Sequence, residues 1–511
     1  MYIPKASGGL STQLVRPLCR RSLPAGSRCL SADAQTPRKE GDISSVFVSL
    51  SGDGKAAPLD ERFADQKKKL IAGRGDQLKR SWDRLLCKLR DEVETIEQRG
   101  SEIIPSISFR DIHTAPRSFH DELRKRGVAI IRGVVPEAEA RGYKEEIEAY
   151  ARANPGTKAF PPNDPQVYEL YWSHPQVRAR SHANMLETQR FLMSFWHSSE
   201  SDAMISPVHP VTYADRLRIR QPGDAGFALG PHTDAGSVER WEDNGYGLGQ
   251  VYQRIFEGRW EEYNPWEASC RLPVMSNLYD GAGACSMFRM FQGWLSMSHT
   301  GPNEGTLLVN PLLSMATAYI LLRPFFVPIN QPPADGSSRI AIDTFLEPSN
   351  WHLEERPSSK LEGATPGYSQ ELNSVLHPHL ELQKTMVHVP QIGPGDYVAW
   401  HCDTIHAVDK VHKGTGDSSV LYIPACPVTE ANIEYVKRQK NDFLKGIPPP
   451  DFPGGKGESE HIGRATVKDL QNYSNEQALR AFGFGKWNTK EENLNHGQRR
   501  VLKKANEILG L

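Results

Sequence analysis

Residues 230–241 read GPHTDAGSVERW and residues 393–410 read GPGDYVAWHCDTIHAVDK, and these two stretches decide the fold that we expect. The first carries His232 and Asp234 two positions apart, so a strand end or a tight loop can present both to one ion. The second carries His401 and His406 at the end of an apolar strand that follows a Pro-Gly-Asp turn. Two imidazoles and one carboxylate form the facial triad of non-haem Fe(II) oxygenases. Because the third ligand lies far along the chain, we expect a β-barrel that brings distant strands to one mouth.

A third stretch lies between these two and strengthens a family resemblance. Residues 291–311 read FQGWLSMSHTGPNEGTLLVNP, a tryptophan-bearing strand, a turn and a second apolar strand that ends at proline. Together with H-T-D at 232–234 and GDYVAWH-x4-H at 395–406, this pattern resembles the Fe(II)/2-oxoglutarate oxygenases of the phytanoyl-CoA dioxygenase-like branch. The resemblance covers roughly residues 105–445, and the wider context is more similar to a fungal and bacterial family without an assigned function.

The resemblance implies a fold, a metal and a reaction. The fold is α+β, with a double-stranded β-helix (jelly-roll, cupin-like) core and flanking and terminal helices. His232, Asp234 and His406 match the ligands of Fe(II), whereas His401 matches a strand position that is not a ligand. The implied co-substrate is 2-oxoglutarate, and the implied reaction is oxidation of a small-molecule substrate. An aspartate at the carboxylate position favours hydroxylation over halogenation, because halogenating relatives have a small residue there.

The residue that anchors 2-oxoglutarate is the point where this sequence departs from the family. Many members place an arginine on the last core strand, whereas this chain has Asp417, Ser418 and Ser419 there. Residues 212–221, TYADRLRIRQ, instead alternate apolar side chains with arginines, which predicts a strand whose arginines share one face. That face is either solvated or borders the co-substrate pocket. We expect Arg220, and next Arg218, to bind the far carboxylate, and the remaining candidates are Arg289, Lys410 and Lys413.

Composition excludes several classes of protein. The 511 residues carry a net charge of -1, which gives no electrostatic footprint for nucleic acid or an anionic membrane surface. We find no apolar run long enough to span a bilayer. The seven cysteines form no C-x-x-C pair, which argues against a zinc ribbon or a disulfide scaffold and favours a reducing compartment. The oligomeric state is not indicated.

The N-terminal residues differ in composition from the rest. Residues 1–31 contain five basic side chains and no acidic one, which is typical of a mitochondrial transit peptide. A disordered tail with the same bias is the alternative, so the expected location is mitochondrial or cytoplasmic. We therefore expect residues 1–58 to form a transit peptide, or a tail, followed by a linker.

The remaining chain divides into three predicted parts. Residues 59–104 are expected to form a helical segment, 105–445 the oxygenase domain, and 446–511 a C-terminal loop and helices that pack on the core. Residues 239–268 form an aromatic insertion, which either lines a substrate pocket or simply packs. Arg339–Phe345 are expected to form a strand, and His377 and His379 to lie at the surface.

Two other functions compete with the dioxygenase. A cupin-like metalloprotein would bind a metal without using 2-oxoglutarate, and a non-catalytic relative would keep the barrel as a binding module. A serine or cysteine hydrolase is not indicated, because the sequence has no G-x-S-x-G motif and no recognisable Cys-His setting.

Overall fold

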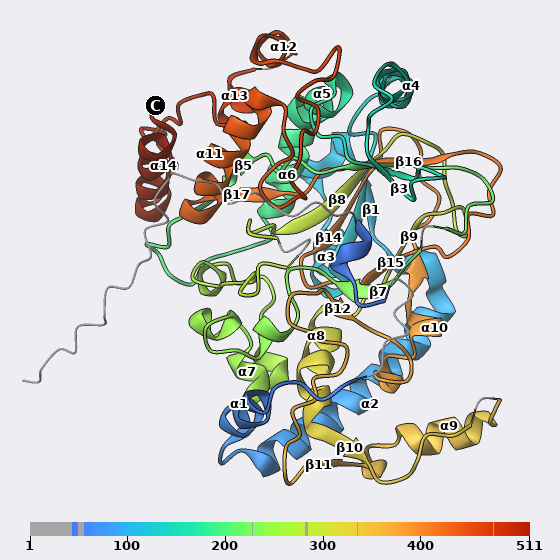
Figure 1. The fold of residues 1–511 in the computed structure, drawn as a ribbon. Helices are drawn as coiled ribbons and strands as arrows, with labels where there is room; N and C mark the ends of the chain where they lie inside the picture. The colour runs from blue at the N-terminus through green and yellow to red at the C-terminus, as the bar shows by residue number, and fades with distance from the viewer. Residues whose placement is uncertain (1–42, 50–55, 227, 282–284, 335, 474) are drawn as a thin grey trace, which may run out of the picture. The chain divides into compact units, whose positions relative to one another are not determined.

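The fold is mixed α+β and is built on two antiparallel sheets (Figure 1). The computed structural model describes residues 43–49, 56–226, 228–281, 285–334, 336–473 and 475–511. These residues belong to a single compact unit, Lys39–Leu511. The transit-peptide prediction concerns residues 1–31 and lies outside the described residues.

The larger sheet has eight strands in the order β1-β2-β14-β8-β16-β6-β4-β3. Its strands pair antiparallel except for β1 and β2, which run parallel. Their bounds are β1 Ser106–Ser108, β2 Val128–Arg132, β3 Ala159–Phe160, β4 Val167–Tyr168, β6 Leu217–Arg220, β8 Phe291–Ser296, β14 Tyr397–His401 and β16 Ser418–Tyr422.

The smaller sheet has five antiparallel strands in the order β12-β7-β15-β9-β13. Their bounds are β7 Leu229–Thr233, β9 Leu307–Val309, β12 Gln370–Glu371, β13 Val387–His388 and β15 His406–Val408. Two further antiparallel pairs are β5 (Ile205–Val211) with β17 (Cys426–Thr429), and β10 (Phe326–Pro328) with β11 (Trp351–Leu353).

Helices surround these sheets, and local sequence signals mark their ends. Gly127 adopts the left-handed conformation that ends α3, and Asn495 and Gln498 form a capping box at the start of α14. The bounds are α1 Arg62–Ile71, α2 Gly75–Arg99, α3 Arg117–Arg126, α4 Glu137–Ala153, α5 His174–Ser181, α6 Ala183–Met193, α7 Gln253–Phe256, α8 Leu313–Leu322, α9 Arg339–Leu346, α10 Leu382–Thr385, α11 Glu430–Lys445, α12 Val467–Tyr473, α13 Glu476–Ala481 and α14 His496–Leu509.

Two core layers follow from the alternation of side chains along the larger sheet. Tyr397 and Ala399 of β14 pack in one cluster with residues of α3, α4 and α6. Val398 and Trp400 of the same strand pack in another cluster with strands β7, β9, β13 and β15 of the smaller sheet. The space between the two sheets is therefore a core that can enclose a site.

Two local predictions were wrong. Arg339–Phe345 is helical within α9, because Ser338 caps its start by accepting a hydrogen bond from the Ala341 N–H. His377 and His379 are buried under the helices instead of lying at the surface. In the part of the chain that the structure describes, no helix has the length and apolar character needed to cross a membrane.

The helical segment at 59–104 makes a buried aromatic contact that can be tested. The indole of Trp82 in α2 is fully buried and stacks on Phe326, with ring centroids 4.4 Å apart. Trp82→Ala should lower the free energy of unfolding by about 3–5 kcal/mol, as buried large-to-small substitutions do. Urea denaturation measures this, with Lys79→Ala on the exposed face of α2 as the control. Equal stabilities for the two variants would contradict the packing role.

Candidate functional site

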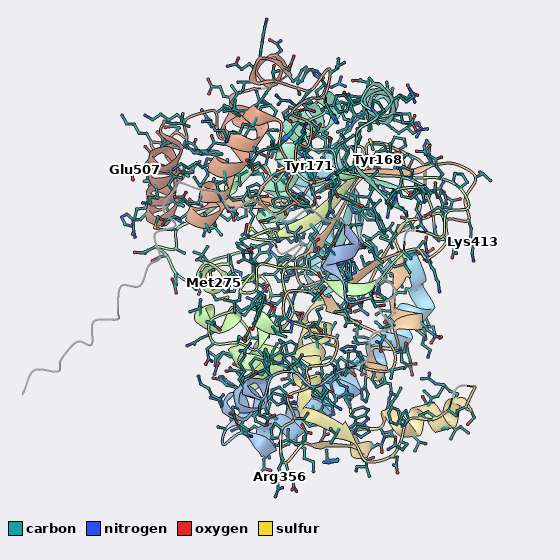
Figure 2. All side chains as sticks on the ribbon, viewed as in Figure 1. Tyr168, Tyr171, Met275, Arg356, Lys413 and Glu507 are labelled. Carbon is teal, nitrogen blue, oxygen red and sulfur yellow. The ribbon has the colours of Figure 1, made fainter. Side chains whose placement is uncertain are left out.

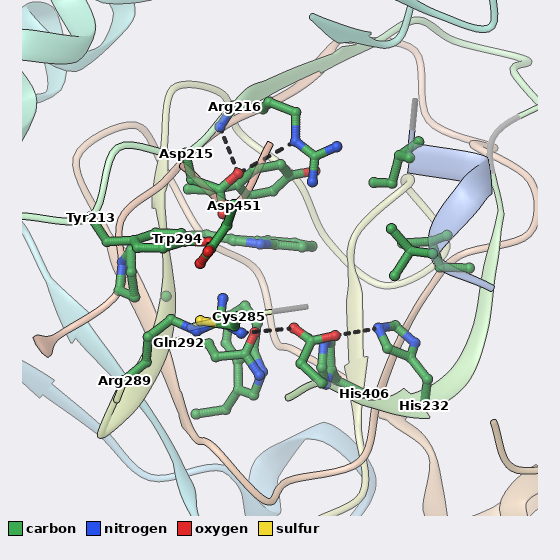
Figure 3. A pocket seen from close by; sticks show the side chains of 18 of the residues that line it. Tyr213, Asp215, Arg216, His232, Cys285, Arg289, Gln292, Trp294, His406 and Asp451 are labelled. Atoms are coloured by element: carbon green, nitrogen blue, oxygen red, sulfur yellow. Dashed lines mark hydrogen bonds and ion pairs between the residues drawn. The ribbon is translucent and has the colours of Figure 1, made fainter. Parts of the chain in front are cut away.

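The structure brings His232, Asp234 and His406 together between the two sheets. His232 lies in β7 and His406 begins β15, and the antiparallel pairing of these strands puts the two residues directly opposite each other. The Nε2 atom of His232 lies 3.5 Å from one Asp234 oxygen, and the Nε2 atom of His406 lies 3.9 Å from the other. Figure 3 shows the two histidines at one side of the cavity.

Backbone carbonyls fix the orientation of both imidazoles. The Nδ1 atom of His232 lies 2.8 Å from the Gly230 oxygen, and that of His406 lies 3.1 Å from the Thr404 oxygen. Each Nδ1–H can therefore donate to a carbonyl, which leaves Nε2 deprotonated and directed at the carboxylate, as a metal-binding histidine requires. Burial, together with the neighbouring His232, lowers the pKa of His406 to about 3, so this ring is neutral at pH 7.

Arg289 lies immediately behind the carboxylate. Its Nη2 atom is 3.6 Å from an oxygen of Asp234. Burial opposes ionisation of Asp234, but His406, His232 and Arg289 outweigh it and hold the pKa of Asp234 below its usual value. Burial also opposes the charge on Arg289, and here Cys285 and Asp234 outweigh it, so the pKa of Arg289 is raised. Asp234 is thus an anion and Arg289 a cation at neutral pH.

The triad opens into a cavity of about 120 Å³. Its wall is largely aromatic and apolar, with a few polar groups, as small-molecule sites generally are. The lining residues used below are Phe47, Tyr213, Asp215, Arg216, Arg289, Gln292, Trp294, Trp400, Tyr422, Asp451 and Phe452.

Comparisons with known proteins identify the family. The family model described as Gig2-like matches residues 57–484. The chain belongs to the Gig2-like family. A curated Escherichia coli K12 relative, the uncharacterised protein YbiU, is 32% identical over 403 residues, which cover 76% of this chain and 88% of YbiU.

Two solved structures share the fold. The crystal structure of GlcNAc Inducible Gene 2 from Candida albicans has a TM-score of 0.78 at 31% identity, and covers 89% of this chain and 96% of that one. A Salmonella typhimurium LT2 protein, whose name assigns it provisionally to the oxidoreductases, has a TM-score of 0.69 at 30% identity. That match covers 84% of this chain and 99% of the Salmonella chain. The resemblance to a fungal and bacterial family is confirmed, and the placement in the phytanoyl-CoA dioxygenase-like branch stays a prediction.

The other histidine of the second motif has a different environment in this Gig2-like protein. His401 ends β14 in the larger sheet and is fully buried. Its ring stacks on Trp196 at 4.6 Å, its Nε2 faces the Pro265 carbonyl at 3.0 Å, and its Nδ1 accepts a hydrogen bond from the Asp403 N–H. Both ring nitrogens are occupied by protein groups, so His401 supports the core.

The arginine strand forms, but neither Arg218 nor Arg220 is among the described residues that line the cavity. Arg220 is fully buried and binds Asp224 and the carbonyl oxygens of Asp409 and Lys410. Arg218 is fully buried too, and its guanidinium covers the ring of Trp294 at 4.6 Å. Arg218 and Arg220 are therefore neither exposed to solvent nor positioned as the expected anchors of 2-oxoglutarate. The arginines that line the cavity are Arg216 and Arg289.

The remaining candidate cations and the aromatic insertion also lie elsewhere. Lys413 is exposed on the loop before β16 (Figure 2), and Lys410 is not among the described residues that line the cavity. Of those lining residues, none comes from 239–268. Tyr252 and Tyr263 of that segment instead donate hydrogen bonds to Asp403, so packing is the correct alternative there.

Both flanks of the predicted oxygenase domain contribute residues that the sequence did not reveal. Ile43, Val46 and Phe47 line the cavity, and the Phe47 ring meets His232 edge to face at 4.8 Å. The carboxylate of Glu371 holds this segment by accepting the backbone N–H groups of residues 48 and 49. Asp451 and Phe452 come from the C-terminal loop. The C-terminal loop is rich in Gly and Pro, and the N-terminal segment is short, so neither carries a recognisable motif. The one sequence feature that could have indicated these residues is the apolar cluster Ile-x-x-Val-Phe at 43–47.

The environment of Arg220 predicts a structural role. Arg220→Ala would leave the carboxylate of Asp224 buried without its cation, which should lower the free energy of unfolding by about 3–5 kcal/mol. Arg84→Ala, which removes an exposed ion pair with Glu261, should cost less than about 1 kcal/mol. Chemical denaturation compares the two. A stable Arg220→Ala variant with weakened 2-oxoglutarate binding would restore the original anchoring hypothesis.

Proposed function

We propose that this protein is an Fe(II)/2-oxoglutarate-dependent dioxygenase that hydroxylates a small-molecule substrate in a double-stranded β-helix core. The observation that carries the proposal is the convergence of His232, Asp234 and His406 inside one cavity, beside a buried arginine. Similarity to a Salmonella typhimurium LT2 protein that is provisionally named an oxidoreductase agrees with it.

The donor set fits a divalent transition metal. Two ligands bound at 2.0–2.2 Å and at right angles would be about 3 Å apart. The ligand atoms of the triad lie within 4.8 Å of one another, so the side chains would have to close by less than about 2 Å around an ion. Two imidazoles and one carboxylate are the set used for non-haem Fe(II), and they leave positions open for other ligands.

The roles of the residues follow from this arrangement. His232, Asp234 and His406 would hold Fe(II), which when bound supplies the oxidation R–H + O2 + 2-oxoglutarate → R–OH + succinate + CO2. Trp400 packs against His406, with ring centroids 5.2 Å apart, and Phe47 covers His232. These rings exclude water from the ligands, which protects the oxidising site from side reactions.

Arg289 and Gln292 are the groups best placed to bind 2-oxoglutarate. Arg289 is a buried cation beside the triad, and its fork geometry suits a carboxylate. The side-chain nitrogen of Gln292 is buried without a hydrogen-bond partner, although it belongs to a residue that lines the cavity. In charge, Fe(II) and Arg289 together balance Asp234 and the two carboxylates of the co-substrate. Arg216 is less suitable, because Asp215 and Glu169 already pair with it.

Anaerobic spectroscopy tests the metal and the co-substrate together. Fe(II) followed by 2-oxoglutarate should produce the weak visible charge-transfer band of the chelate. His232→Ala, Asp234→Ala and His406→Ala should each abolish the band, because each removes a ligand. His401→Asn serves as the matched control, because it removes a buried imidazole that is outside the triad. Metal binding without the band would favour a cupin-like metalloprotein, and absence of metal binding would favour a binding module.

The role of Arg289 makes a separate prediction. Arg289→Ala should raise the apparent Km for 2-oxoglutarate about 10–100-fold, a loss of roughly 1.4–2.8 kcal/mol, because the carboxylate loses its charged donor. Arg289→Lys keeps the charge without the fork and should fall between Ala and wild type. Titration of Fe(II) in each variant controls for damage to the triad. An unchanged Km in Arg289→Ala would show that another residue binds the far carboxylate of 2-oxoglutarate.

A further inference from the structure

The wall of the cavity opposite the triad carries a carboxylate that the proposed reaction does not use. Asp451 follows α11 on the C-terminal loop and points into the cavity, across from the histidines (Figure 3). One oxygen accepts hydrogen bonds from the Ser286 N–H at 2.9 Å and the Tyr213 hydroxyl at 3.1 Å. The other oxygen accepts from the Ser286 hydroxyl. All of these donors are neutral.

Asp451 differs in this respect from the other carboxylates of the cavity. Asp234 has Arg289 at 3.6 Å, and Asp215 has Arg216 at 3.5 Å. Among the residues that the structure describes, none forms an ion pair with Asp451. Burial raises the pKa of Asp451 and outweighs the hydrogen bonds from Ser286 and Tyr213 and the charge of Arg438, which lower it.

With the metal and the co-substrate bound, the negative charge of Asp451 would still have no paired cation. Fe(II), Arg289, Asp234 and 2-oxoglutarate sum to neutrality, and Arg216 already has two carboxylate partners, Asp215 and Glu169. A carboxylate that is largely removed from water is destabilised unless a cation pairs with it. The substrate also binds in this cavity, so it can supply a positive charge to pair with Asp451.

The aromatic wall suits the same kind of ligand. Cations bind favourably over the faces of Trp, Tyr and Phe rings. Three rings of this wall already bind guanidinium groups, with Arg216 over Phe452 at 4.9 Å, Arg218 over Trp294 at 4.6 Å and Arg289 over Tyr213 at 5.5 Å. Trp400, Tyr422 and Phe47 also line the cavity.

We propose that Asp451 binds the positively charged group of the substrate, and that the substrate is a small organic ammonium compound. The carboxylate then holds the cation at one end of the cavity, while the other end of the substrate reaches the triad. Asp451 acts as a specificity-determining residue, and the assignment of the reaction itself rests on the proposed dioxygenase function.

Matched pairs of ligands test the charge requirement directly. Choline and its uncharged isostere 3,3-dimethylbutan-1-ol form one pair, and 5-aminopentan-1-ol and hexan-1-ol form the other. Calorimetric titration into the anaerobic protein with Fe(II) and 2-oxoglutarate should show at least one cation binding 10-fold or more tightly than its isostere. Equal affinities within both pairs would overturn the proposal, and this comparison requires no variant.

Substitutions at Asp451 then test whether this residue causes the preference for cations. Asp451→Asn should reduce the difference within the responsive pair to about 2-fold or less, and Asp451→Glu should retain part of it. Asp202→Asn, which removes an exposed carboxylate, is the control for net charge. A preference that survives in a folded Asp451→Asn protein would refute the role of Asp451.

The charge-transfer band keeps the two proposals separate. A cation preference in a protein that gives no band with Fe(II) and 2-oxoglutarate supports the ammonium site and refutes the dioxygenase. A normal band without any cation preference supports the dioxygenase and refutes the ammonium site.

Discussion

The site depends on one strand pairing, the antiparallel contact of β7 with β15 that puts His406 opposite His232. Directly opposed residues on a shared face have Cβ atoms about 5 Å apart, which is the separation that lets two imidazoles reach one ion. A slip of one residue would turn one ring to the other face. The pairing of β15 with β9 fixes the register from the other side, and β12 pairs with β7 beyond it. The five-stranded sheet thus sets the geometry of the metal ligands.

Local sequence predicted the strands and helices well where a strong pattern existed. The H-x-D and H-x4-H spacings located three ligand candidates, because each spacing is set by a few residues of adjacent backbone. The position of Arg220 was not predictable in the same way. The alternation of residues around Arg220 predicts a polar face that points toward solvent or a ligand. In the structure that face points inward between the two sheets, and Leu217 and Ile219 pack outward against helices. Only the tertiary pairing of Arg220 with Asp224 explains how such a face is buried.

The buried arginines also show how the interior distributes charge. Three arginines of the interior pair with carboxylates: Arg220 with Asp224, Arg271 with Asp403, and Arg289 with Asp234. The first two pairs are structural, since their carboxylates serve no cavity. In the third pair the carboxylate is also a candidate metal ligand. A bound cation would compete for Asp234 and release Arg289 for an anionic ligand, so one ion pair can couple the binding of metal and co-substrate.

The cavity wall includes residues from segments before and after the two sheets in the chain, with Phe47 preceding them and Phe452 following them. The segment between them by itself would carry the three candidate ligands but would leave His232 uncovered and would lack Asp451. The candidate ligands and the walls of the pocket therefore come from different parts of the chain. Substrate preference in relatives can change through the flanking segments while the metal ligands stay the same.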